Sequence, residues 1–166
     1  MRRRQSVTND LILGGLAGAA AIYLMDRADT AMMEAEAPET RARTVAARPG
    51  GMDPAHVIAH RAADYIGVRL DDRQPHPAGQ AIHYGIGVVM GALYAATANR
   101  LPLVGAGRGM AFGWMMSLGL DEGLNTYLGT AGRPSNYPWQ DHARGVVAHG
   151  VWGLVVDSVL RVLNRR

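Results

Sequence analysis

The sequence predicts an all-α protein, an up-and-down bundle of four membrane-spanning helices with an extra amphipathic helix in its first long connection. Three observations favour this fold. Apolar residues gather in four separate segments of the 166-residue chain. Of the 31 formal charges, 16 fall between Asp26 and Arg73, and none lies within 74–99 or 109–120. The 21 glycines recur at four-residue spacing inside the apolar segments, where glycine lets helix backbones approach closely in lipid.

The average composition hides this pattern, because one charged segment dilutes the apolar ones to a mean hydropathy of −0.04. A soluble helical domain is the alternative, but each glycine costs a water-exposed helix about 1 kcal/mol relative to alanine. The chain has no cysteine, which excludes disulfide scaffolds, thiol nucleophiles and cysteine-ligated metals. All 17 basic residues are arginine and the net charge is only +3, so we expect no nucleic-acid partner.

A helix needs roughly 20 residues to cross about 30 Å of hydrocarbon. The second and third apolar segments meet this length, whereas the first has 15 residues, Leu11–Met25. The fourth is interrupted by Asp157, which Arg161 can neutralise from four residues further on. We expect transmembrane helices at about 10–27, 78–98, 102–124 and 143–163.

The first segment follows Arg2, Arg3 and Arg4 and therefore also resembles a cleaved secretory or twin-arginine signal. No small-x-small cleavage site follows Met25 directly. The nearest one, at 35–37, precedes Pro38, which should block cleavage. We therefore expect an uncleaved first helix.

Arginine placement predicts the topology, because short cytoplasmic loops are enriched in basic residues. Arginines lie in both terminal tails and in the short turn from Arg100 to Arg108. The longer connection between the third and fourth segments carries only Arg133, with Arg144 at the start of the next helix. Both termini and the 100–108 turn are thus predicted to be cytoplasmic.

The hydrophilic insert 28–77 is predicted to contain an amphipathic helix at 54–70, with Asp53 as its N-cap and Pro54 in its first turn. Its apolar stripe is Ile58, Ala62, Tyr65, Ile66 and Leu70. The helix is expected to lie on the membrane or on the bundle. The opposite stripe of His56, His60 and Asp64 has the spacing of metal ligands, although two histidines four residues apart often occur by chance.

Small residues form one stripe along each apolar helix, and we interpret them as helix-packing positions. They are Gly14, Gly18, Gly87, Gly91, Gly105, Gly109, Gly113 and Gly153.

Ionisable side chains form a layer at one end of the predicted bundle. An up-and-down topology brings the corresponding helix ends together, and ionisable groups in a bilayer usually face a partner or a cavity. Such a layer could bind a proton or a divalent metal ion, or act only as an interhelical hydrogen-bond cluster. A catalytic role is the weakest reading, since the chain has no HExxH, GxSxG or phosphate-binding loop, so we assign no catalytic residue and no cofactor beyond a possible divalent metal. The layer comprises Asp26, His83, Asp121, Glu122 and His149.

Four stretches resemble the YagU-like family of small bacterial inner-membrane proteins: the Gly/Ala-rich first segment, HYGIGVVMGALYA at 83–95, LVGAGRGMAFGWMMSLGLDEGL at 103–124 and AHGVWGLVVDSVLR at 148–161. The resemblance implies a multipass protein of the bacterial cytoplasmic membrane with no assigned biochemical activity. It also implies His83, Glu122 and His149 as the matching polar set, with Asp121 standing where the family pattern has a histidine.

Two functions are therefore expected. One is binding of a proton or cation by the His/carboxylate layer near the extracytoplasmic face. The other is a structural or assembly role, in which the glycine stripes pack the protein with itself or within a larger membrane complex. The lipid bilayer is the partner common to both.

Overall fold

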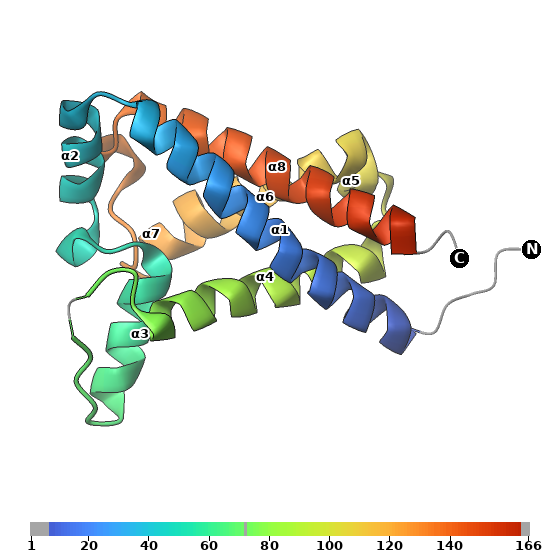
Figure 1. Ribbon diagram of the computed structural model, residues 1–166, viewed down its shortest axis with the longest axis horizontal. Coiled ribbons are helices and arrows are strands. Elements are labelled where there is room, and N and C mark those ends of the chain that lie inside the picture. The colour runs from blue at the N-terminus through green and yellow to red at the C-terminus, as the bar shows by residue number, and fades with distance from the viewer. Residues whose placement is uncertain (1–6, 72, 164–166) are drawn as a thin grey trace, which may run out of the picture.

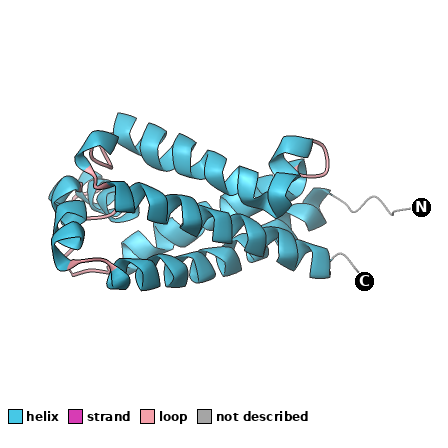
Figure 2. Ribbon diagram, turned by 90° about the horizontal axis from the view of Figure 1, so that it is seen from above, coloured by secondary structure: helices cyan, strands magenta, loops and turns pink. Residues whose placement is uncertain are grey.

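The computed structural model describes residues 7–71 and 73–163, and these residues form helices and loops with no strand (Figure 2). The all-α prediction is therefore confirmed. The long helices are α1 (Val7–Ala35), α4 (Pro77–Thr97) and α8 (Trp139–Leu163). A further long stretch consists of α6 (Met110–Met116), the π-helical segment η3 (Ser117–Leu124) and α7 (Asn125–Tyr127). The shorter elements are α2 (Pro38–Ala47), η1 (Pro49–Gly51), α3 (Pro54–Tyr65), α5 (Pro102–Gly105), η2 (Ala106–Gly109) and η4 (Pro134–Asn136).

Helix α1 packs against both α4 and α8, and α6 packs against α8. The first turn of α1, the last turn of α8 and α5 all lie at one end of the bundle (Figure 1). We call this the turn end. Helices α2 and α3 and the connection from α7 to α8 lie at the opposite end, the insert end (Figure 1).

Two helices in the described part of the chain, α1 and α8, are long and apolar enough to cross a membrane. These are the helices of the first and fourth apolar segments. The sequence had instead favoured the second and third by length. The core helix of a soluble protein can have the same length and composition, so these two helices alone do not establish four spans.

The third apolar segment is not one helix over 102–124. It breaks at η2, where Gly107, Arg108 and Gly109 have φ angles of 59°, 57° and 87°. Positive φ is easily reached by glycine and rarely by other residues, so this glycine-rich turn ends one helix and starts the next at Met110. Helix α1 continues past the predicted membrane span 10–27 to Ala35, three residues before Pro38.

Helix α3 lies on the bundle against α4 and is shorter than the predicted helix 54–70. It ends at Tyr65, and Gly67 follows with a φ of 75°. Its buried face is made of small or polar residues, and not of the predicted apolar stripe: Tyr65 is 93% exposed and Ile66 is 72% exposed. The buried residues are Ala55, His56, Val57, Ala59 and Ala63.

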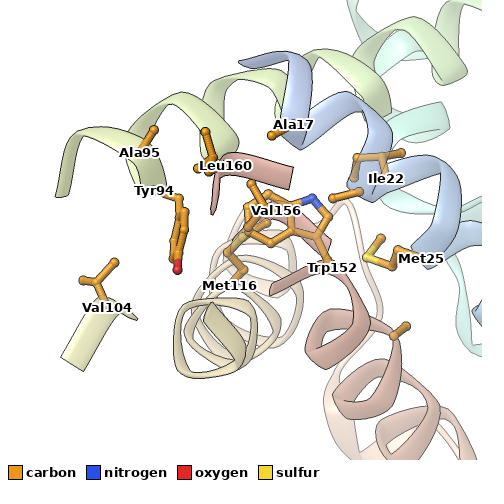
Figure 3. Close-up of a cluster of buried hydrophobic side chains, with 12 residues drawn as sticks. Ala17, Ile22, Met25, Tyr94, Ala95, Val104, Met116, Trp152, Val156 and Leu160 are labelled. Atoms are coloured by element: carbon orange, nitrogen blue, oxygen red, sulfur yellow. The ribbon is translucent and has the colours of Figure 1, made fainter. Parts of the chain in front are cut away.

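The core of the bundle centres on Trp152 of α8 and Tyr94 of α4, both almost fully buried (Figure 3). Phe112 of α6 connects them, with ring centroids 5.6 Å from Tyr94 and 5.9 Å from Trp152. Ala17 and Ile22 of α1 close the cluster from the other side (Figure 3). Three of the four long helical stretches are thus joined by aromatic rings on the turn-end side of the bundle.

Helices α1 and α4 approach each other at glycines. A Cβ added at Gly18 would overlap the Gly87 carbonyl, and one added at Gly91 would overlap the Gly14 carbonyl. Helices α6 and α8 meet in the same way, because a Cβ at Gly113 would overlap the His149 carbonyl. These contacts set the helix spacing that positions the polar groups described next.

Candidate functional site: histidine–carboxylate pairs around a cavity

The first pair joins α1 to α4. His83 Nε2 lies 2.9 Å from Asp26 Oδ1, and both side chains are about a third exposed. A neutral imidazole that carries its proton on Nε2 can donate this hydrogen bond to an ionised Asp26. The pair is therefore satisfied without an additional proton.

The second pair joins α8 to the π-helical segment. His149 Nδ1 lies 3.0 Å from the Gly145 carbonyl oxygen, and Nε2 lies 3.3 Å from Asp121 Oδ2. A carbonyl oxygen can only accept, so Nδ1 must carry a proton and donate it. The contact of Nε2 with Asp121 is within ion-pair distance but is not a hydrogen bond. His149 is therefore oriented by one hydrogen bond within α8 and approaches Asp121 at ion-pair distance.

The third pair joins α8 to Glu122 and differs from the second. His142 Nε2 lies 3.1 Å from the Pro134 carbonyl oxygen, so Nε2 donates there. The other ring nitrogen, Nδ1, lies 2.6 Å from Glu122 Oε1 and forms a hydrogen bond with it. Two oxygen acceptors face this imidazole, and a second proton must sit between His142 and Glu122.

His56 provides a contrast within the same molecule. Its Nδ1 lies 2.7 Å from Asp53 Oδ2, but its Nε2 accepts a hydrogen bond from the backbone N–H of His76 at 2.9 Å. The contact of Nδ1 with Asp53 is within ion-pair distance without being a hydrogen bond. His56, which is 2% exposed, therefore ties α3 to the start of α4 through Nε2.

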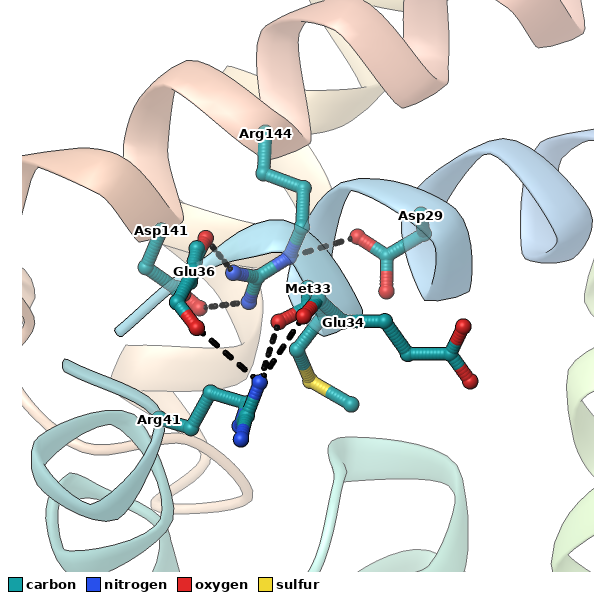
Figure 4. Close-up of polar contacts among 7 residues, drawn as sticks. All are labelled: Asp29, Met33, Glu34, Glu36, Arg41, Asp141 and Arg144. Carbon is teal, nitrogen blue, oxygen red and sulfur yellow. Dashed lines mark hydrogen bonds and ion pairs between the residues drawn. The ribbon is translucent and has the colours of Figure 1, made fainter. Parts of the chain in front are cut away.

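Arg144 is a buried cation at the same end of the bundle. It is 4% exposed, and its guanidinium forms ion pairs with Asp29, Glu36 and Asp141 (Figure 4). Arg41 donates to the backbone oxygens of Glu34 and Glu36 and so fixes the end of α1 against α2 (Figure 4). Three carboxylates from α1 and its following turn and from α8 are thereby gathered around one arginine.

The three pairs and Arg144 line one cavity of about 1020 Å³ near the insert end. All five predicted residues of the layer, Asp26, His83, Asp121, Glu122 and His149, lie on its wall. Apolar side chains from α1, α4 and α6 line the remainder, among them Ile22, Ile86, Val89 and Met116. The cavity brings titratable groups from all four long helical stretches to one space.

The pairing differs from the set implied by sequence. Glu122 contacts His142 rather than His83 or His149, and the polar layer predicted from the sequence does not include His142 or Arg144. His142 is seven residues before His149, which places both on one helix face. That spacing was the available signal.

Over residues 7–71 and 73–163, no three histidine, aspartate or glutamate side chains come close enough together to hold a metal ion. The layer forms separate pairs. On α3, the spacing of His56, His60 and Asp64 does not produce a ligand group among the described residues either.

A second buried polar network lies at the turn end. Asp157 accepts a hydrogen bond from the Tyr94 hydroxyl at 2.8 Å and pairs with Arg161 Nε at 2.5 Å. The predicted neutralisation of Asp157 by Arg161 is confirmed. Arg108 adds a contact of 3.7 Å to Asp157 and donates to Ser158 Oγ.

No family model, curated protein or solved structure matches this chain.

Proposed function

We propose that this chain is a multipass protein of the bacterial cytoplasmic membrane, with four spans and cytoplasmic termini, that binds protons at histidine–carboxylate pairs. The spans follow α1, α4, the α6–α7 stretch and α8. The turn end, which carries Arg100 and Arg108, would face the cytoplasm, and the insert end would face outwards. The resemblance to the YagU-like family favours the same arrangement.

The observation that carries the proposal is the placement of one imidazole between two oxygen acceptors. His142 lies between Glu122 and the Pro134 carbonyl, and both contacts are hydrogen bonds. The arrangement needs one proton more than a neutral imidazole and an ionised carboxylate supply. The His83–Asp26 pair can accept a proton on the free ring nitrogen while its existing hydrogen bond persists.

The π-helical segment supports a role for this region. π-Helices are rare and occur frequently at functional sites, because the wider turn changes the direction of side chains. Here the segment Ser117–Leu124 carries both Asp121 and Glu122. A regular α-helix would place two consecutive residues about 100° apart on the helix surface, yet these two acids contact histidines seven residues apart on α8.

The experiment is nuclear magnetic resonance of protein labelled with ¹⁵N in histidine and ¹³C in carboxylates. At near-neutral pH we expect the His142–Glu122 pair to hold the extra proton, on the ring or on the carboxyl group, because two oxygen acceptors face the ring. Glu122→Gln should return His142 to the neutral form. His60→Gln, outside the cavity, is the control. A neutral His142 ring facing an ionised Glu122 at that pH would refute the proposal.

The alternative is assembly through glycine stripes. A Cβ at any of the eight predicted packing glycines would meet atoms of its own chain within 4 Å. Because those surfaces are occupied within the protomer, they favour internal packing over contact with a second copy. Cross-linking in native membranes tests this alternative, and a cross-link through Gly14 or Gly91 positions would support it.

A further inference from the structure

The apolar part of the cavity is not explained by proton binding. Histidine–carboxylate pairs need no space of about 1020 Å³, which is the size of pockets that take drug-sized ligands. The wall beyond the pairs is formed by Ile82, Ile86 and Val89 of α4 and by Met116 and Leu120 opposite them. The cavity is thus polar at the insert end and apolar towards the middle of the bundle.

The cavity also opens along α4. Val89 is 58% exposed and Ile86 is 37% exposed, yet both line the cavity. These residues follow His83 by one to two helical turns and lie on the part of α4 proposed to cross the membrane. A ligand with an apolar body could therefore enter from the hydrocarbon side.

The excess of negative charge on the cavity wall favours a positively charged ligand. Among the described residues, six carboxylates and two arginines line the cavity. With one extra proton on the His142 pair, negative charge on the wall still exceeds positive charge. Asp26 contributes an uncompensated charge, because it pairs with His83, which can be neutral, and with no arginine in the described part of the chain. Its side chain is 36% exposed, so its second oxygen is available to a ligand.

We infer that the cavity binds a lipophilic organic cation, with its charge next to Asp26 and its apolar body between Ile86 and Val89 of α4 and Met116 of α6. The inference rests on the proposed membrane location and adds a ligand class to the proton-binding site. Attraction to an ionised carboxylate in a partly desolvated space favours the cation, and apolar contact supplies the remainder of the binding free energy.

The test uses tetraphenylphosphonium as the cation and tetraphenylborate as an anion of the same shape. Binding to the purified full-length protein is measured by equilibrium dialysis at about pH 8. We expect saturable binding of the cation and weaker binding of the anion. Asp26→Asn, which can keep the hydrogen bond to His83, should raise the dissociation constant of the cation about tenfold. Asp64→Asn on the exposed side of α3 is the matched control and should leave it unchanged.

Val89→Trp provides a second variant that removes no charge. It fills the apolar opening and should also weaken cation binding, while the histidine resonances still report the extra proton. Equal binding of the cation and the anion, or a dissociation constant unchanged in both Asp26→Asn and Val89→Trp, would overturn the inference. Absence of cation binding together with an intact extra proton would overturn it and leave the proton-binding proposal standing. Cation binding together with neutral histidines that face ionised carboxylates would support the ligand inference and refute the proton-binding proposal.

Discussion

Acidic side chains at the two ends of the bundle have different sets of partners. At the turn end Asp157 is 7% exposed and is held by Arg161 and the Tyr94 hydroxyl. At the insert end Arg144 holds three carboxylates, but Asp121 and Glu122 are partly exposed and face histidines beside a large cavity. Arginine stays charged at any physiological pH, whereas histidine gains or loses a proton near neutrality. The partner of an acid therefore decides whether its carboxylate fixes structure or exchanges protons.

Backbone packing is also tighter at the turn end than at the insert end. At the turn end Gly109 and Gly153 touch so closely that a Cβ on either would overlap the carbonyl of the other. At the insert end a Cβ on Gly85, which lines the cavity, would meet nothing within 4 Å. The helices are therefore in direct backbone contact at the turn end, whereas a cavity separates them at the insert end.

The largest expected effect is that of removing the buried cation of the insert end. Arg144→Gln leaves Asp29, Glu36 and Asp141 without their shared arginine, and breaking a buried ion pair costs about 4 kcal/mol of folding free energy. Thermal and denaturant unfolding in detergent measures the loss. Arg61→Gln, which loses only hydrogen bonds to two exposed backbone carbonyls, should cost about 1 kcal/mol. Equal losses for the two variants would contradict the burial argument.

Asp157→Ala tests the structural role of the acid at the turn end. It leaves the Tyr94 hydroxyl and Arg161 without their acceptor, and we expect a loss of about 3 kcal/mol. Asp26→Ala at the insert end should cost about 1 kcal/mol, because both members of its pair are partly exposed. The same unfolding measurement applies. If Asp26→Ala proved the more damaging, the distinction between a structural and an exchangeable acid would fail.

Glycine substitutions give the smallest and most local comparison. Gly153→Ala forces α8 away from the Gly109 backbone, and overpacking of this kind costs about 2 kcal/mol. Gly85→Ala adds a methyl group to open space and improves helix propensity, so it should be neutral or stabilising by about 0.5 kcal/mol. Comparable losses at both positions would show that the cavity at the insert end is filled.

Periodicity and charge placement were sufficient for much of this picture. They predicted an all-α chain, the neutralisation of Asp157 by Arg161, and the five polar residues that line the cavity. They did not predict the break at Gly107–Gly109, because a glycine can continue a helix or end it, and only the backbone angles decide.

The pairing of the polar layer was also beyond the sequence. A π-helical segment shifts the facing of Asp121 and Glu122, whereas four-residue spacing in the sequence describes a regular α-helix. The sequence shows Arg144 only as a topology signal, because its partners Asp29 and Glu36 are distant in sequence and Asp141 lies one turn before it. Likewise, the apolar stripe predicted for α3 is largely exposed at Tyr65 and Ile66, and other side chains of α3, among them His56, form its buried face.

The claim that the His142–Glu122 pair already holds an extra proton near neutrality is tested most directly by counting protons. An indicator titration from about pH 7.5 to pH 5 compares the wild-type protein with the Glu122→Gln variant. Without the carboxylate, His142 should begin neutral and become protonated, so the variant should take up about one proton more than the wild-type protein. Asp64→Asn serves as the control for loss of an exposed carboxylate. Uptake by Glu122→Gln that equals or falls below that of the wild-type protein would contradict the account.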